Sequence, residues 1–269
     1  MTTGTAPAPR VEEPQAPQFR AEKKDFPWWL VVIAAILGWM IYKIVTDEKY
    51  AKAFERVQPG LWNTVKATVF GFAIALVIGL FAGLGRIARN PIARNVAITY
   101  TEFVRGVPIL VLIFTISYVI VPQLATGLGF ENSSVDNFWR AVSALAIIYG
   151  AYLAEVFRAG IESVPKGQTE AGRAVGMSHA QTMRRIVLPQ AVRNMTPAIG
   201  NDLIAMLKDS SLLSVLGIRE LTQNGRIYAS SSFQFRPTFL VLTFFYLSMT
   251  LVLSLLLRWY RKQLGLDGD

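Results

Sequence analysis

The sequence predicts an all-α integral membrane protein with about six transmembrane helices. Of its 269 residues, 52% are hydrophobic and only 17% are charged, whereas soluble domains usually carry about 25% charge. Several uncharged windows are long enough to cross a hydrocarbon core of about 30 Å. The windows lack the alternation typical of strands, and a spanning segment must satisfy its own backbone hydrogen bonds, so we expect helices.

The composition also excludes several functional classes. The chain contains no cysteine and one histidine, His179, which excludes a disulfide scaffold, a thiolate metal site and a His–His metal pair. We therefore expect no catalytic residue and no metal site. The formal charge is +9. A basic balance fits nucleic acid, an anionic membrane surface or membrane topology, and the apolar content favours a membrane protein without a nucleic-acid partner.

The elements follow from the N-terminus. Residues 1–25 contain four prolines among small and polar residues and predict a disordered tail. Residues 26–46 predict an additional N-terminal transmembrane helix, because Trp28–Tyr42 is uncharged and its aromatic ends fit the membrane interfaces. Further uncharged spans are expected at Ala67–Gly85, Gly106–Phe130 and Pro237–Leu257. Two spans interrupted by charges are expected at Phe138–Phe157 and Asn194–Leu216.

Basic residues set the expected orientation. With six spans, both termini lie on one side of the membrane. The segments on that side carry about twice as many Lys and Arg residues as the segments on the other side. The positive-inside rule therefore places both termini, including the C-terminal tail at 259–269, in the cytoplasm.

The predicted cytoplasmic segment at 158–193 is too patterned to be a simple linker. Thr169 is placed to cap a helix that carries Glu170 in its first turn. Pro189 is expected to end the second half of the segment. We expect an apolar face from four residues, Ala174, Val175, Met177 and Ala180.

Part of this segment carries a recognisable motif. Residues 170–189 read EAGRAVGMSHAQTMRRIVLP, which resembles the EAA loop of ABC-transporter permease subunits, with the pattern EAA-x3-G-x9-I-x-L-P. Six of the seven positions match. Only the third position departs, with glycine where alanine is usual. The seven positions are Glu170, Ala171, Gly172, Gly176, Ile186, Leu188 and Pro189.

Three other stretches extend the resemblance. Thr101–Phe114, Ala151–Ser178 and Leu207–Thr222 are similar to permeases of the polar amino-acid uptake family, the histidine, glutamine, glutamate and arginine type. The resemblance covers about residues 60–258. It implies a type I importer core of five helices, to which this chain adds one N-terminal helix, with the coupling loop at 160–193.

The resemblance also implies a function and partners. It implies a multi-pass subunit of the bacterial inner membrane that imports amino acids. A cytoplasmic ABC ATPase dimer would drive it through the EAA loop, a second permease subunit would pair with it, and an extracytoplasmic amino-acid-binding protein would deliver substrate. Membrane lipid surrounds such a subunit. This chain has no P-loop of the form G-x4-GK[ST], so we expect no cofactor in it. ATP and Mg would be bound by the ATPase.

Ionisable residues inside spans are costly in lipid and are functional candidates by default. Glu102 and Arg105 lie three residues apart on one helical face, and Pro108 breaks the helix after them. A broken helix that binds substrate and a structural ion pair both fit this pattern. The candidates for the substrate pathway or gate are Glu102, Arg105, Glu155, Asp202, Lys208 and Asp209.

Small residues mark one predicted span. Gly71, Gly79, Gly83 and Gly85 let another helix approach closely. Both a permease–permease interface and internal packing fit this stripe.

A stand-alone secondary transporter or channel is the alternative function, although the two halves show no clear internal repeat. An intramembrane enzyme is a third, with little chemistry available. The residues leave open which amino acid is carried and whether the permease pair is homodimeric or heterodimeric. They also leave open whether this subunit holds a substrate site and what the N-terminal helix does.

Overall fold

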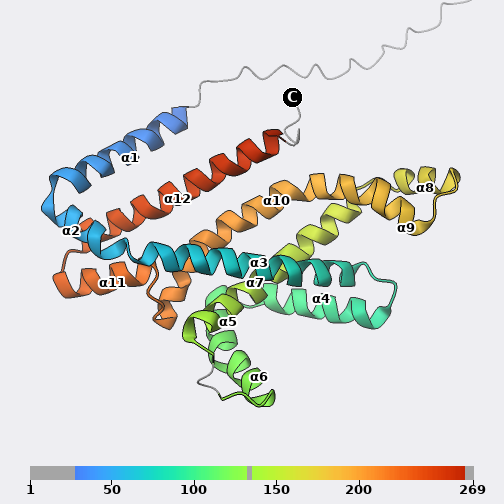
Figure 1. Cartoon of the computed structure of the whole chain (residues 1–269), viewed down its shortest axis with the longest axis horizontal. Helices are drawn as coiled ribbons and strands as arrows, with labels where there is room; N and C mark the ends of the chain where they lie inside the picture. The colour runs from blue at the N-terminus through green and yellow to red at the C-terminus, as the bar shows by residue number, and fades with distance from the viewer. Residues whose placement is uncertain (1–27, 132–134, 264–269) are drawn as a thin grey trace, which may run out of the picture.

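The computed structural model describes residues 28–131 and 135–263, and all their secondary structure is helical (Figure 1). The predicted tail at 1–25 and the last residues of the C-terminal tail lie outside this range. Five helical segments are long and apolar enough to span a membrane. They are α1 (Trp28–Thr46), α3 (Gly60–Arg86), the run of α5, η1 and α6 (Ile109–Gly127), α7 (Asn137–Glu162) and α12 (Phe235–Gln263).

The sixth predicted span, Asn194–Leu216, falls on two elements. Helix α10 (Leu188–Asp209) contains most of it, and a 3-10 helix, η4 (Ser210–Leu216), contains the rest. Helix α10 does not count among the apolar membrane helices, because it carries four charged residues and two prolines. The sixth crossing and the orientation of the termini therefore stay predictions.

The helix is interrupted at Pro108, as the sequence predicts. Helix α4 (Pro91–Gly106) ends at Gly106, and Val107 and Pro108 are extended. Helix α5 (Ile109–Thr115) then continues through the π-helical turn η1 (Ile116–Ile120) into α6 (Val121–Gly127). Proline cannot supply the N–H that a continuous helix needs, so the helix stops and restarts in a new direction.

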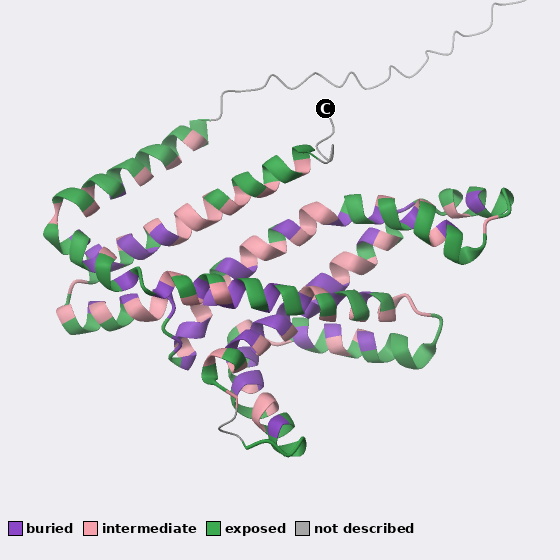
Figure 2. Cartoon of the chain, viewed as in Figure 1, coloured by how far each residue is buried: buried purple, intermediate pink, exposed green. Residues whose placement is uncertain are grey.

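The centre of the bundle is the contact between α3 and α7. A Cβ atom added at Gly79 would lie 2.6 Å from the Cβ of Leu153, and one at Gly83 would lie 2.8 Å from the carbonyl oxygen of Ala154. The glycine stripe therefore lets two helices of one chain approach, and internal packing accounts for it. Figure 2 shows α7 largely buried, whereas α1 is largely exposed.

The two ends of the bundle differ (Figure 1). One end holds α2 (Glu48–Val57) and α11 (Leu221–Ser232), which pack on each other and on α12. The opposite end holds α8 (Lys166–Ala174), α9 (His179–Thr182) and the π-helical turn η3 (Met183–Val187). The additional helix α1 packs on α2 and α12, at the edge of the bundle.

Candidate functional site

The EAA motif forms two short helices at one end of the bundle. Helix α8 begins at Lys166, directly after the extended residue Pro165. The prediction that Thr169 caps this helix is therefore wrong, and Thr169 lies inside it. Pro165 occupies the cap position, and no side chain caps this helix. Glu170 is exposed in the middle of α8.

Gly176 ends α8 in a left-handed conformation, with φ of 83°. The N–H of Gly176 donates to the carbonyl of Arg173, and the N–H of Met177 donates to the carbonyl of Gly172. These two bonds form a Schellman motif, which stops a helix and favours glycine at this position. A Cβ atom at Gly176 would meet nothing within 4 Å. The conformation of the turn therefore accounts for this glycine.

Gly172, the position that departs from the motif, makes the close approach. It is buried, and a Cβ atom on it would lie 2.8 Å from Cδ1 of Ile186 and 3.0 Å from Cγ2 of Thr182. Helix α8 thereby packs on α9 and η3. Ser178 starts α9 with a reciprocal capping box to Gln181, which fixes the corner between the two helices.

Pro189 does not end the segment as predicted. It lies in the first turn of α10, and the chain stays helical through it. The π-helical turn η3 directly precedes it, and the N–H of Leu188 donates to the carbonyl of Met183. This wider turn lets the helix continue although proline has no N–H to donate. The same arrangement occurs at η1, which precedes Pro122.

The predicted apolar face of the motif is exposed. Val175 is 78% exposed, Ala174 and Ala180 are also exposed, and Met177 is half-buried. An apolar surface beside an exposed glutamate has the chemistry of a protein contact.

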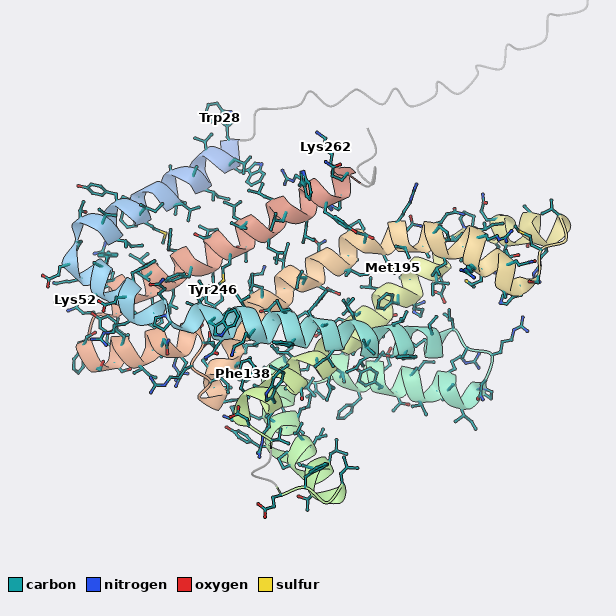
Figure 3. All side chains as sticks on the ribbon, in the orientation of Figure 1. Trp28, Lys52, Phe138, Met195, Tyr246 and Lys262 are labelled. Carbon is teal, nitrogen blue, oxygen red and sulfur yellow. The ribbon has the colours of Figure 1, made fainter. Side chains whose placement is uncertain are left out.

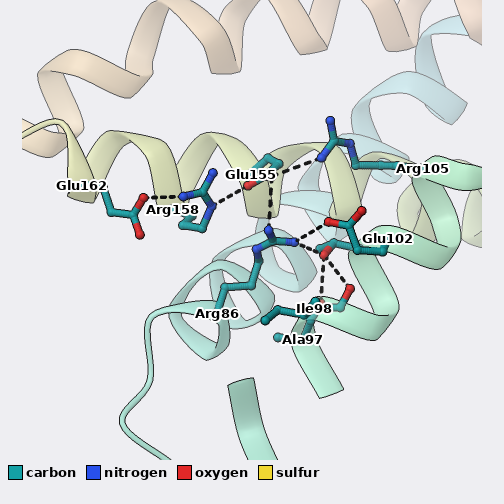
Figure 4. A network of polar contacts seen from close by, with 9 residues as sticks. Arg86, Ala97, Ile98, Glu102, Arg105, Glu155, Arg158 and Glu162 are labelled. Atoms are coloured by element: carbon teal, nitrogen blue, oxygen red, sulfur yellow. Dashed lines mark hydrogen bonds and ion pairs between the residues drawn. The ribbon is translucent and has the colours of Figure 1, made fainter. Parts of the chain in front are cut away.

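A polar cluster lies where α3, α4 and α7 meet (Figure 4). Glu155 of α7 accepts from Nη1 of Arg105 at 3.1 Å, from Nη2 of Arg86 at 3.3 Å and from Nε of Arg158 at 2.6 Å. Glu102 lies 3.5 Å from Nη1 of Arg86. The structure therefore brings together three predicted residues, Glu102, Arg105 and Glu155, with Glu155 as the common acceptor.

Sequence reasoning missed two members of this cluster. Arg86 and Arg158 follow uncharged or weakly charged windows, and the pattern assigned both to cytoplasmic loops. Arg86 instead ends α3 with only 11% of its side chain exposed, and it also donates to Thr101. Arg158 lies inside α7 and also pairs with Glu162. For Arg158 the available signal was its spacing of three residues from Glu155. For Arg86 it was the position directly after a span, from which a long side chain can reach back into the bundle.

The remaining candidates lie apart from this cluster, on α10. Asp209 accepts a hydrogen bond of 2.8 Å from the Tyr149 hydroxyl of α7. Asp202 has a buried oxygen, Oδ2, with no hydrogen-bond partner among the described residues. Lys208 is exposed. The structure thus pairs Asp209 internally and leaves Asp202 with capacity for a further donor.

A second buried carboxyl group escaped the sequence reasoning. Glu220 is fully buried at the start of α11. It accepts from the N–H groups of Thr222 and Gln223 and, at 2.9 Å, from the Tyr246 hydroxyl of α12. Burial raises the pKa of Glu220 to about 7, against the hydrogen bonds that lower it. Glutamate is uncommon as a helix cap, so only the packing identifies Glu220 as a buried cap.

No group of three or more His, Asp or Glu side chains in residues 28–131 and 135–263 is arranged to hold a metal ion. The described site consists of a projecting helical pair, α8 and α9, and of carboxylates and guanidinium groups within the bundle. Such groups can bind another molecule, form ion pairs and position neighbouring side chains.

Comparison with known proteins places this arrangement in a family. The profile described as "Binding-protein-dependent transport system inner membrane component" matches residues 75–265. The chain is 39% identical to the glutamine transport system permease protein GlnP of Escherichia coli K12, over 76% of this chain and 91% of GlnP. It is 38% identical to the L-cystine transport system permease protein TcyL of Bacillus subtilis, over 76% of this chain and 83% of TcyL.

A third relative and two solved structures are also similar to this chain. The arginine transport system permease protein ArgU of Corynebacterium glutamicum is 33% identical, over 82% of this chain and 74% of ArgU. A structure described as an amino acid ABC transporter with histidines has a TM-score of 0.70 and 36% identity, and the match covers 79% of this chain and 96% of that one. The inward-facing methionine transporter MetNI shares the fold, with a TM-score of 0.61 over 77% of this chain and 95% of that one, at 21% identity. The chain therefore belongs to the family of binding-protein-dependent transport system inner membrane components.

Proposed function

We propose that the chain is the membrane-spanning subunit of an ATP-driven importer of polar amino acids in the bacterial inner membrane. The family match and the relatives named for glutamine, cystine and arginine support this proposal. The observation that carries the coupling role is the projecting pair of helices α8 and α9, which presents exposed Glu170 beside exposed Val175. An ATPase subunit binds this surface, and its movement is transmitted along η3 into α10.

The proposed complex contains two ATPase subunits, a second permease subunit and an extracytoplasmic binding protein. ATP and Mg are bound by the ATPase, and this chain contributes no residue to hydrolysis. Both termini and α8 lie on the cytoplasmic side, whereas α2 and α11 face the binding protein. The domain boundaries follow, with a permease core at 60–258 and the additional helix α1 outside it.

Co-purification tests the coupling surface. A tagged chain is expected to bring down its ATPase, and Glu170→Lys is expected to abolish this capture, because it reverses the charge at the centre of α8. Glu55→Lys is the matched control, since Glu55 is exposed on α2 at the other end of the bundle. Equal capture by the Glu170 variant refutes the coupling role. Transport by the chain alone, without ATP, supports a stand-alone transporter instead.

Asp202 is the substrate-pathway candidate that the geometry favours. An amino acid carries an ammonium group, and a buried carboxylate oxygen without a partner can accept from it. Asp202→Asn is expected to reduce amino-acid uptake at least tenfold, on the order of one lost charged hydrogen bond, while ATPase capture stays unchanged. Asp209→Asn serves as the comparison, because Asp209 already has a partner in Tyr149. Stimulation of ATPase activity by a panel of amino acids identifies the substrate.

A further inference from the structure

The final turns of α12 lie beside the start of α10 across two adjoining hollows. Both hollows are lined by Thr196 and Tyr260, and their volumes are about 210 and 460 Å³. Arg258 and Arg261 line the first hollow, and Arg184 and Arg193 line the second. We call the two hollows together the arginine groove. None of the described residues that line it is acidic.

Three of the guanidinium groups that line the groove are available to a ligand. Arg184, Arg193 and Arg258 are exposed and form no ion pair with any described residue. The described contact of Arg258 is with the ring of Trp29 on α1, whose centroid lies 5.9 Å from its guanidinium carbon. This contact holds Arg258 against an aromatic face without neutralising its charge.

The groove lies at the boundary between apolar and polar surface. The uncharged window of α12 ends at Leu257, and Arg258 is the next residue. Figure 3 shows Trp28 and Lys262 at the same end of the bundle, where α1 begins and α12 ends. Trp28 is 71% exposed, and Trp29, Trp259 and Tyr260 are at least half exposed. Aromatic residues in this position are typical of the level of the lipid headgroups.

The walls of the groove continue into apolar surface. Leu188 and Val192 line the second hollow and are 44% and 48% exposed. Ile204 and Leu257 line the first hollow. A ligand that fits both parts has an anionic head at the arginines and hydrocarbon along the helices. Basic hollows between transmembrane helices bind anionic lipid headgroups in this way.

We propose that the arginine groove is a binding site for an anionic phospholipid, with its phosphodiester between α10 and α12. The lipid bridges Arg258 of α12 and Arg193 of α10, and Arg184 reaches the same site from η3. Because η3 belongs to the EAA motif, the bound lipid ties the last transmembrane helix to the coupling segment. The lipid site itself rests on the groove alone and stands whether or not the proposed transport function is correct.

Native mass spectrometry of the full chain, purified with the subunits it assembles with, tests the proposal. After removal of lipid, the protein is titrated with phosphatidylglycerol, phosphatidylethanolamine or inorganic phosphate. We expect phosphatidylglycerol to be retained at least tenfold better than phosphatidylethanolamine, and an excess of inorganic phosphate not to displace it. Equal retention of the two lipids overturns the proposal without any variant. Displacement by inorganic phosphate also overturns it, in favour of a phosphate site.

A pair of matched double variants locates the site. Arg193→Gln with Arg258→Gln is expected to weaken phosphatidylglycerol retention about thirtyfold, since each basic residue near an anionic lipid contributes about fivefold. The control is Arg226→Gln with Arg236→Gln, two exposed arginines at the α11 end of the bundle. Unchanged retention in the first double variant, or an equal loss in the control, refutes the assignment to this groove.

Discussion

The buried carboxyl group of Glu220 makes the stability of this protein depend on pH. Its pKa of about 7 lies above the ordinary value of 4.5. Below pH 4.5 the group is protonated in both the folded and unfolded chain. Between pH 4.5 and 7 the folded protein keeps a proton that the unfolded chain releases, so the free energy of unfolding falls as pH rises. The difference between the two pKa values corresponds to about 3 kcal/mol in total.

Glu220→Gln removes this titration. The amide cannot ionise, so the variant is expected to lose the part of the pH dependence that Glu220 causes. It still accepts a backbone N–H at the start of α11, and its NH₂ group can donate to the Tyr246 hydroxyl. We therefore expect the variant to be less stable than the unsubstituted chain near pH 5 and to gain relative stability toward pH 8.

Thermal unfolding of the detergent-solubilised chain at several pH values between 5 and 8 measures this effect. The midpoint of the unsubstituted chain is expected to fall across this window, and that of Glu220→Gln is expected to fall less. Glu55→Gln is the matched control, because Glu55 is an exposed carboxylate at the same end of the bundle. Parallel pH profiles for the unsubstituted chain and the Glu220 variant refute the reasoning.

Three further predictions concern the packing and the coupling segment. Gly176→Ala forces alanine into a left-handed turn and is expected to destabilise the corner after α8 by about 1 kcal/mol and to weaken ATPase capture. A Cβ atom at Gly172 meets the movable Cδ1 of Ile186 and the side chain of Thr182 but no backbone atom, and Gly172→Ala keeps an ordinary helical conformation, so it is expected to retain capture. Equal loss in both variants contradicts this. Glu155→Gln removes the carboxylate that Arg86, Arg105 and Arg158 share and is expected to lower thermal stability by about 2 kcal/mol. Glu102→Gln, at a 61% exposed side chain, is expected to change it by less than about 1 kcal/mol. Gly79→Ala is expected to destabilise the α3–α7 contact by about 2 kcal/mol in the same unfolding assay, because its Cβ meets that of Leu153, and an unchanged midpoint contradicts this.

The sequence by itself determined the fold class and most of the spans. In lipid, a long apolar segment without strand-like alternation satisfies its backbone hydrogen bonds as a helix, and five of the six predicted spans coincide with apolar helices in the structure. Pro108 also fixed a break, because the missing N–H acts locally. The EAA motif was recognisable because its spacing lies within one short stretch of chain.

The tertiary structure decided which charges meet and what each glycine does. Arg86 of α3 joined Glu155 of α7 because a long side chain reaches across helices, and a linear pattern does not contain that distance. Arg158, in contrast, pairs with Glu155 inside α7 at a spacing of three residues. Glu220 became a buried cap only through the packing of α11 on α12. Gly176 ends α8 in a left-handed turn and Gly172 makes the close approach, and both a positive φ and a close neighbour are properties of the folded backbone. Contacts between residues far apart in sequence depend on the placement of whole helices, and this placement is set by the sum of many small packing terms.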